Sequence, residues 1–440
     1  MPAAASRVRL LEPLRLRGFR TLWAGMTVSL IGDGVTLVAI AWQVYQLSNV
    51  PTALGLTAAA MAIPHVLLLL VGGAVSDRVE RRRVMLAADL VRGAALMTLG
   101  VLSLTGALQI WHMILISACY GAGSAFFGPA FDAIVPDLVP EDLLPQANSL
   151  DQFVRPIAAR LVGPAIGGWI IAVTGVGWAF MIDAGTFAVS VCCLVYLRFV
   201  QPPILREAGI EDTSTWAEIK EGFAFVRSRV WLWGTLLAAT LSYLVFLGPA
   251  EILLPYLVKN DLGGSAADLG TILAAGGIGA VTASLFMAHR GIPARTMTFI
   301  YLAWTASTLM VAGYGIARSA WQLMAVCFAF NLFETAGLIV WLTLKQTLVP
   351  ARLLGRVSSF DWFISVGLMP VSYALAGPVA GLLGIRETLV AAGVLGATIT
   401  LGFMFLPGIR DVERIEPVSN GIPTPPGGPT QHPDPALLSR

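Results

Sequence analysis

The sequence predicts an all-α polytopic membrane protein whose twelve transmembrane helices form two pseudo-symmetric bundles of six. Three observations predict this class: an apolar composition, apolar runs that recur along the chain, and an internal repeat. Of the 440 residues, 56% are hydrophobic and 12% are charged, whereas a soluble domain has about 25% charged residues. The apolar runs have the length of roughly 20 residues that crosses a bilayer as a helix. Only helices satisfy the backbone hydrogen bonds of such runs within lipid.

The elements are expected in a simple order along the chain. A basic cytoplasmic arm at 1–18 precedes a first bundle at 19–199, a linker with an amphipathic helix at 200–230, a second bundle at 231–407 and a proline-rich disordered tail at 408–440. The helices are expected at 19–47, 52–75, 84–105, 109–131, 147–173, 177–199, 231–258, 266–288, 296–316, 320–346, 357–383 and 387–407.

The basic residues fix the expected orientation. Loops on one side carry only Lys259, Arg318 and Arg386, whereas the other loops and both termini carry most of the remaining lysines and arginines. Basic residues are retained on the cytoplasmic side, so both termini are expected to be cytoplasmic, in a bacterial cytoplasmic membrane. The net charge of +2 gives no reason to expect a nucleic-acid partner.

An internal repeat supports the division into two halves. A single offset places Trp111 on Trp321, Asp151 on Asp361, and Leu22-Trp23 on Leu232-Trp233. Six helices return the chain to its starting side, so the two halves are expected to be parallel repeats, an arrangement found in transporters that alternate access.

The stretch 73–83 between the second and third helices is short, basic and cytoplasmic by this orientation. We expect Asp77 to cap the start of the eleventh helix, and Asp361 to receive Arg78, Arg81 or Arg82. Such contacts would exist only while the cytoplasmic side is shut, so the stretch is a candidate gate. The alternative is that these arginines are only orientation signals in a solvated loop.

Ionisable groups inside membrane helices are costly and usually functional. Asp33, Glu251 and Glu334 are therefore the candidate proton-coupling or substrate-binding groups, because a carboxyl group removed from water can hold a proton in one conformation and release it in another. A structural role for Asp33, through neighbouring hydroxyl groups or Arg155, is the alternative.

Other charged residues in the helices are expected to be structural. We expect Arg155 to pair with Asp151, and Asp89 and Arg92 to pair with each other or with the loop at 73–83, because the members of each pair lie about one helical turn apart. Asp183 is expected to be a solvated or capping residue near the outer end of the sixth helix. Arg160 needs a partner in its apolar setting, and structural pairing is favoured over a functional role.

The remaining candidates are small or aromatic. The fifth helix contains Gly163, Pro164, Gly167 and Gly168, which permit close packing and a bend. Aromatic residues expected to line a central cavity suit bulky amphipathic ligands, although ordinary core packing is the alternative for each of them; they are Trp42, Tyr243, Phe246, Phe330 and Phe333.

The motif Gly73-x-x-x-Asp77-Arg78-x-x-Arg81-Arg82 and the six-plus-six layout resemble the major facilitator superfamily. The segments Phe127-Gly128-Pro129-Ala130 and Ala147-Asn148-Ser149, with Gly32-Asp33-Gly34, resemble the drug:proton antiporter branch that holds macrolide efflux pumps and the enterobactin exporter. Gly163-Pro164 and Gly167-Gly168 are similar to part of the antiporter motif, but Ala159 replaces its upstream glycine. Glu80 likewise replaces the usual glycine of the loop motif.

The resemblance implies a transporter rather than an enzyme, acting as a monomer in the lipid bilayer on a small-molecule substrate and on protons. We expect proton-driven export of amphipathic compounds, typical of multidrug efflux. The alternatives are a dedicated exporter of an endogenous product such as a siderophore, or a non-transporting receptor or scaffold. The chain lacks an ATP-binding loop pattern, and its four cysteines lack metal-site spacing, so no cofactor or metal is expected.

Overall fold

The computed structural model describes residues 9–140, 143–200 and 215–414. The described chain contains 12 helices that are long and apolar enough to cross a membrane, as the sequence predicts. Parts of the expected arm, linker and tail, at 1–8, 201–214 and 415–440, lie outside the described residues.

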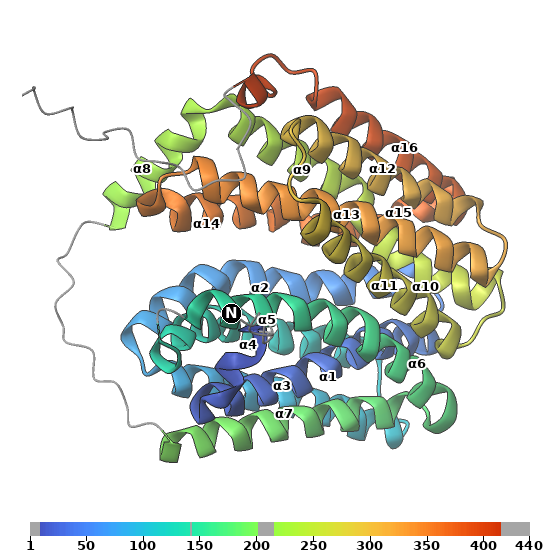
Figure 1. Ribbon diagram of the computed structural model, residues 1–440. Helices are drawn as coiled ribbons and strands as arrows, with labels where there is room; N and C mark the ends of the chain where they lie inside the picture. Colours follow the sequence, from blue (N-terminus) through green and yellow to red (C-terminus); the bar gives the residue numbers. More distant parts are fainter. Residues whose placement is uncertain (1–8, 141–142, 201–214, 415–440) are drawn as a thin grey trace, which may run out of the picture.

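The first group of helices covers the N-terminal half of the chain (Figure 1). Its elements are η1 Arg9–Arg15, α1 Arg17–Leu47, α2 Pro51–Arg78, α3 Arg81–Leu104, α4 Ile110–Leu138, α5 Leu144–Pro156, the π-helical η3 Ile157–Val162, α6 Gly163–Thr174 and α7 Val176–Val200. The segments α5, η3 and α6 together form the single span that the sequence predicts at 147–173.

The second group covers the C-terminal half. Its elements are α8 Thr215–Ser228, α9 Val230–Gly248, the π-helical η4 Pro249–Leu253, α10 Leu254–Tyr256, the π-helical η5 Leu257–Asp261, α11 Ala266–Arg290, α12 Thr296–Ile316, α13 Ala320–Leu348, α14 Ala351–Gly367, α15 Met369–Leu383, α16 Ile385–Phe403 and η6 Asp411–Arg414. The π-helical segments and the break between α14 and α15 are not predicted from the sequence.

The helix ends define two faces of the molecule. The terminal face holds the turns after α2, α4, α8, α11 and α13 and both ends of the described chain, and the opposite face holds the turns after α1, α3, α6, η5, α12 and α15. On the opposite face, Gly175 and Gly384 join the fifth and sixth spans of each group with φ values of 90° and 99°. L side chains rarely adopt this backbone conformation, so glycine permits both single-residue turns.

The two groups pack together at the opposite face. One apolar cluster runs through both groups there, from Tyr45 and Leu54 to Ile252 and Tyr373. The Tyr45 hydroxyl donates to the Ile252 carbonyl at 2.6 Å, and Asn49 donates to Asn260 at 2.6 Å. In Figure 1 the groups accordingly converge where α6, α10 and α11 meet.

The terminal face is built differently, because each group there has its own apolar cluster. In the first group this cluster includes Phe19, Met85 and Phe131, and in the second it includes Trp231, Tyr301 and Trp341. Apolar burial therefore joins the groups at one face and stabilises each of them separately at the other.

The helix α8 lies where the sequence predicts an amphipathic helix. The ring of Phe223 lies 6.1 Å from that of Phe360, and Val226 is buried in the cluster of the second group. This helix therefore packs on the terminal end of the second group.

Candidate functional site

Asp33 lies near the middle of α1 between two glycines that bring other helices close. A Cβ atom at position 32 would lie 1.9 Å from Asp183 Oδ1 on α7, and one at position 34 would lie 2.7 Å from the Ala159 carbonyl oxygen on η3. The two glycines thus place the Asp33 carboxyl where α1 meets two neighbours, and no larger residue fits at either position.

The hydroxyl group of Tyr120 on α4 donates a hydrogen bond to Asp33 Oδ1. A tyrosine hydroxyl group can also accept a hydrogen bond. The pair can therefore stay bonded whether the carboxyl group is ionised or protonated. The hydrogen-bonding partner of Asp33 is thus a hydroxyl group and not Arg155. Arg155 instead bonds Asp151 at 2.6 Å, as the sequence predicts.

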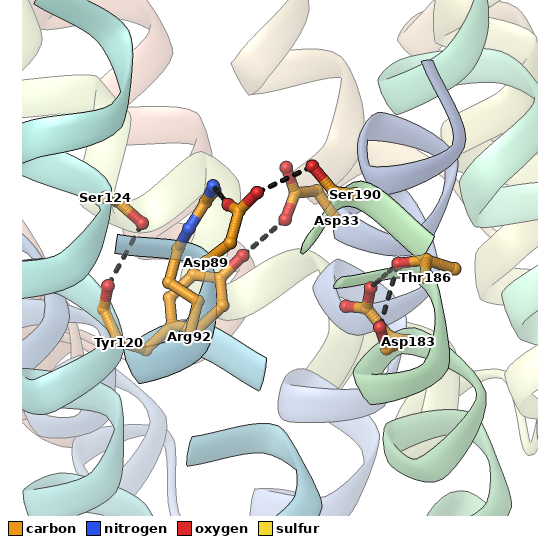
Figure 2. A network of polar contacts seen from close by, with 8 residues as sticks. All are labelled: Asp33, Asp89, Arg92, Tyr120, Ser124, Asp183, Thr186 and Ser190. Carbon is orange, nitrogen blue, oxygen red and sulfur yellow. Dashed lines mark hydrogen bonds and ion pairs between the residues drawn. The ribbon is translucent and has the colours of Figure 1, made fainter. Parts of the chain in front are cut away.

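Asp89 and Arg92 of α3 form the expected pair beside Asp33, and it is buried (Figure 2). Asp89 also accepts a hydrogen bond from Ser190 on α7 at 2.6 Å. The Arg92 guanidinium carbon lies 4.5 Å from the ring centroids of both Phe127 and Phe187. Cation–π attraction and the ion pair together stabilise this buried cation.

The prediction that Asp183 is solvated or caps a helix is wrong. Its side chain is 0% exposed and accepts hydrogen bonds from Thr36 at 2.5 Å and from Thr186 at 2.7 Å. Asp183 becomes buried because Gly32 lets α1 pack directly over it. A glycine in α1 that faces a carboxyl group in α7 gives no signal in the sequence of either helix alone.

The charges of this cluster do not balance when every group is ionised. Of the eight residues in Figure 2, three have a carboxyl group (Asp33, Asp89 and Asp183) and one, Arg92, has a guanidinium group. Three negative charges and one positive charge would leave −2 at a depth where uncompensated charge is costly. The cluster is therefore chemically suited to bind protons.

Glu251 and Glu334 of the second group also accept hydrogen bonds from tyrosine hydroxyls. Tyr373 on α15 donates to Glu251, and Tyr243 on α9 donates to Glu334 at 3.1 Å. All three candidate carboxyl groups thus have the same kind of partner. Tyr120 and Tyr373 are not predicted from the sequence, because their positions in apolar runs do not distinguish them from core aromatics.

Two of these pairs join corresponding spans of the two groups, although the repeat aligns only Asp33 with Tyr243. The repeat places Tyr120 on Phe330, about one turn before Glu334. Each pair joins the first and fourth spans of its group, but the acid lies on the first span in one group and on the fourth in the other.

The residues that resemble part of the antiporter motif, Gly163, Pro164, Gly167 and Gly168, lie in α6. The three glycines permit close contacts of α6 with α1 and with α11. Cβ atoms at Gly163 and Gly167 would lie 2.6 Å and 2.7 Å from the Cα atoms of Gly34 and Val35 on α1. One at Gly168 would lie 2.6 Å from the Ala266 carbonyl oxygen of α11, in the other group. This geometry supports the packing interpretation, and Pro164 lies at the start of α6, directly after the π-helical η3.

The aromatic candidates divide by burial. Phe246 lies 5.5 Å from Tyr243 and 6.1 Å from Phe330, measured between ring centroids. Phe246 is 2% exposed and Trp42 is 9% exposed, so in this conformation both belong to the shared apolar cluster and do not line an open cavity. Tyr243, Phe330 and Phe333 are half-buried.

The loop arginines do not contact Asp361 in this structure. Arg81 donates to Asp137 and to the Ala133 carbonyl on α4, and Arg82 pairs with Glu80 at 2.9 Å. Asp361 instead pairs with Lys345 of its own group and accepts from Trp341 at 3.1 Å. The expected pairing of Asp361 with Arg81 or Arg82 is therefore corrected for this conformation, in which these charges pair within their own group at the terminal face. The side chains of Gly73, Asp77 and Arg78 lie outside the described residues.

Replacing Lys345 by methionine should lower the free energy of unfolding by up to about 3 kcal/mol, because Asp361 would be left partly buried without its cation. Adding Asp361→Asn should restore most of the loss. Melting of the detergent-solubilised variants measures both effects, and a double variant no more stable than Lys345→Met would contradict the pairing.

Replacing Gly32 by alanine should cost about 1–3 kcal/mol, since the new methyl group overlaps the Asp183 carboxyl group. Gly185→Ala on α7 is the matched control, because a Cβ atom there meets nothing within 4 Å. Equal melting temperatures for the two variants would show that α1 and α7 are not packed this closely.

Two groups of six membrane-spanning helices, with acidic side chains held inside them, define a multi-pass transporter of the major facilitator fold. The family model described as transmembrane secretion effector matches residues 9–425, and the chain belongs to this family. The family and the relatives below are transporters rather than enzymes.

Three curated relatives match along nearly their whole length. Macrolide efflux protein A of Streptococcus pyogenes is 24% identical, covering 90% of this chain and 97% of its own. The multidrug efflux pump Tap of Mycolicibacterium fortuitum is 26% identical, covering 91% and 97%. The enterobactin exporter EntS of Citrobacter koseri (strain ATCC BAA-895 / CDC 4225-83 / SGSC4696) is 25% identical, covering 92% and 95%.

Solved structures share the fold. A bacterial homologue of the iron transporter ferroportin superposes with a TM-score of 0.68 at 13% identity, covering 89% of this chain and 99% of its own. A bacterial homologue of the human lysosomal transporter Spinster superposes with a TM-score of 0.65 at 14% identity, covering 94% of this chain and 100% of its own.

Proposed function

We propose that this protein exports amphipathic small molecules across the bacterial cytoplasmic membrane by alternating access, driven by protons that move inward. One observation carries the proposal: three carboxyl groups on membrane-spanning helices, Asp33, Glu251 and Glu334, each accept a hydrogen bond from a tyrosine hydroxyl. Such a pair can gain or lose a proton while the hydrogen bond between its two groups is kept. The efflux functions named for the relatives support the direction of transport.

Orientation and conformation follow from the same proposal. Arginines 81, 82 and 83 lie at the terminal face, which we assign to the cytoplasm because basic residues are retained there. The two groups share an apolar cluster at the opposite face and have separate clusters at the terminal face. By this assignment the protein is an inward-facing carrier, in which Arg81 and Arg82 of the proposed gate bond within the first group of helices.

The transport step follows from a rocking of the two groups against each other, each moving as one body in a monomeric protein. Closing the terminal face would require Asp77 and Arg78, at the end of α2, to meet α14. Opening the opposite face would break the hydrogen bonds of Tyr45 and Asn49 with the second group.

Transport into proteoliposomes with an acidic lumen tests the proposal. We expect a macrolide antibiotic or the lipophilic cation tetraphenylphosphonium to accumulate, and an uncoupler that collapses the pH gradient to stop accumulation. Accumulation that survives the uncoupler, or that never exceeds protein-free vesicles, would contradict the proposal.

The second candidate is a dedicated exporter of an endogenous product such as a siderophore. The similarity to an enterobactin exporter over 92% of this chain supports this second candidate. Accumulation of a catecholate siderophore, without either of the other two compounds, would favour this candidate.

A further inference from the structure

Arg160 places a cation within the span formed by α5, η3 and α6. Its side chain is exposed, and an exposed guanidinium group inside a span is not stable against lipid tails. It must therefore face water or protein between the groups. Consistent with this, Arg160 Nη1 lies 3.4 Å from Asn331 Oδ1 on α13 of the second group.

The backbone fixes Arg160 at the interface. A Cβ atom at Gly277 on α11 would lie 2.6 Å from the Arg160 carbonyl oxygen, so the two groups are in direct contact at this residue. Pro164 lacks the amide that would bond this carbonyl in an α-helix, and residues 157–162 are π-helical. Such segments occur frequently at functional sites.

Two carboxyl groups of the second group interact electrostatically with Arg160. Glu334 lies three residues after Asn331 on α13, hence on the same helix face, and Glu251 is exposed on η4. Arg160 acts on both carboxyl groups. Its charge also acts on Tyr243 on α9, Cys327 on α13 and Tyr373 on α15.

Charges on the remaining neighbours of η3 have partners of their own. Asp151 and Arg155 on α5 form an ion pair, and Asp268 on α11 bonds Ser265. Asp33 on α1 interacts with Arg92 and Arg155. The acids left to interact with the Arg160 cation are therefore Glu251 and Glu334 of the second group.

We propose that Arg160 is the counter-cation of Glu251 and Glu334, supplied across the interface by the first group, and that a proton or a cationic substrate replaces it during transport. The inference rests on the proposed function and names its substrate class, hydrophobic cations. Because Arg160 and the acids belong to different groups, the attraction between them holds the groups together until the acids are neutralised.

Labelling with N,N′-dicyclohexylcarbodiimide, which modifies protonated carboxyl groups in apolar surroundings, tests the assignment without any substrate. Peptide mass spectrometry of the whole protein reads each carboxyl group as a function of pH. Arg160→Gln should extend the labelling of Glu251 and Glu334 upward by about one pH unit, the shift that 1.36 kcal/mol of lost attraction produces. Arg160→Lys, which keeps the charge, should resemble the wild type.

Asp33 is the internal control, since the cations that act on it are Arg92 and Arg155 and not Arg160. Its labelling profile should not move in either variant, which also shows that Arg160→Gln is folded. Identical profiles of Glu251 and Glu334 in the wild type and Arg160→Gln would overturn the assignment, as would the absence of labelling at both in every variant.

Binding of two isosteric probes of opposite charge tests the substrate class. Arg160→Gln should bind tetraphenylphosphonium about tenfold more tightly, because the competing cation is gone, and should not gain affinity for tetraphenylborate. Weaker or unchanged phosphonium binding would overturn this part of the inference. A labelling shift without pH-driven transport would instead leave Arg160 assigned and refute the proposed function.

Discussion

Asp33→Asn is expected to abolish accumulation driven by a pH gradient while leaving exchange of substrate across the membrane intact. Asparagine preserves the size of the side chain and can still accept from Tyr120, but it cannot take up a proton. The variant should therefore equilibrate tetraphenylphosphonium between the two sides of a proteoliposome without concentrating it. Driven uptake should fall to the level of protein-free vesicles.

The matched control is Asp268→Asn, the same chemical change in the capping box of α11 at the opposite face. This variant should keep driven uptake, because Asp268 lies at a helix end and is bonded to Ser265. Driven uptake at the wild-type rate in Asp33→Asn would remove Asp33 from the coupling mechanism.

Arg92→Met is expected to produce the largest loss of stability, about 3–5 kcal/mol, because it leaves the fully buried Asp89 without its cation. Methionine fills much of the space between Phe127 and Phe187, so lost charge rather than lost packing dominates the effect. Melting of the purified protein in detergent measures the change.

Two further variants separate this cause from a general effect of losing arginine. Asp89→Asn combined with Arg92→Met removes both charges and should recover most of the stability. Arg83→Met removes an arginine that is 74% exposed and paired with Glu80, so it should cost less than about 1 kcal/mol. A double variant as unstable as Arg92→Met would show that the buried ion pair is not what stabilises this cluster.

The helical layout could be predicted because lipid imposes it. Every expected span overlaps one of the 12 apolar spans of the described chain, and the span at 296–316 has the same limits in the structure. Apolar length and basic loops determine such boundaries within each segment alone. The π-helical segments could not be predicted, because they depend on contacts such as that of Gly277 with the Arg160 carbonyl oxygen.

The candidate site could be predicted only in part. Asp33, Glu251 and Glu334 stand out because charge is rare inside membrane helices. Their tyrosine partners and the burial of Asp183 depend on which helix faces which, and this is set by close approaches at Gly32 and Gly34. The partner of Asp361 likewise depends on conformation, which a loop motif does not encode.

Distance measurements between spin labels test most directly whether proton binding and movement of the two groups are coupled. With the native cysteines replaced by alanine, labels at Leu104 and Leu382, which are 46% and 86% exposed, report on the opposite face in the first and second groups. A second pair at Phe199 and Phe405, 78% and 63% exposed, reports on the terminal face.

Acidification of wild-type protein in lipid nanodiscs is expected to lengthen the distance at the opposite face and shorten it at the terminal face. The combined variant Asp33→Asn, Glu251→Gln and Glu334→Gln should show the same distances at every pH. Wild-type distances that do not change with pH, or a triple variant that still responds as the wild type does, would contradict coupling between these carboxyl groups and the movement of the two groups.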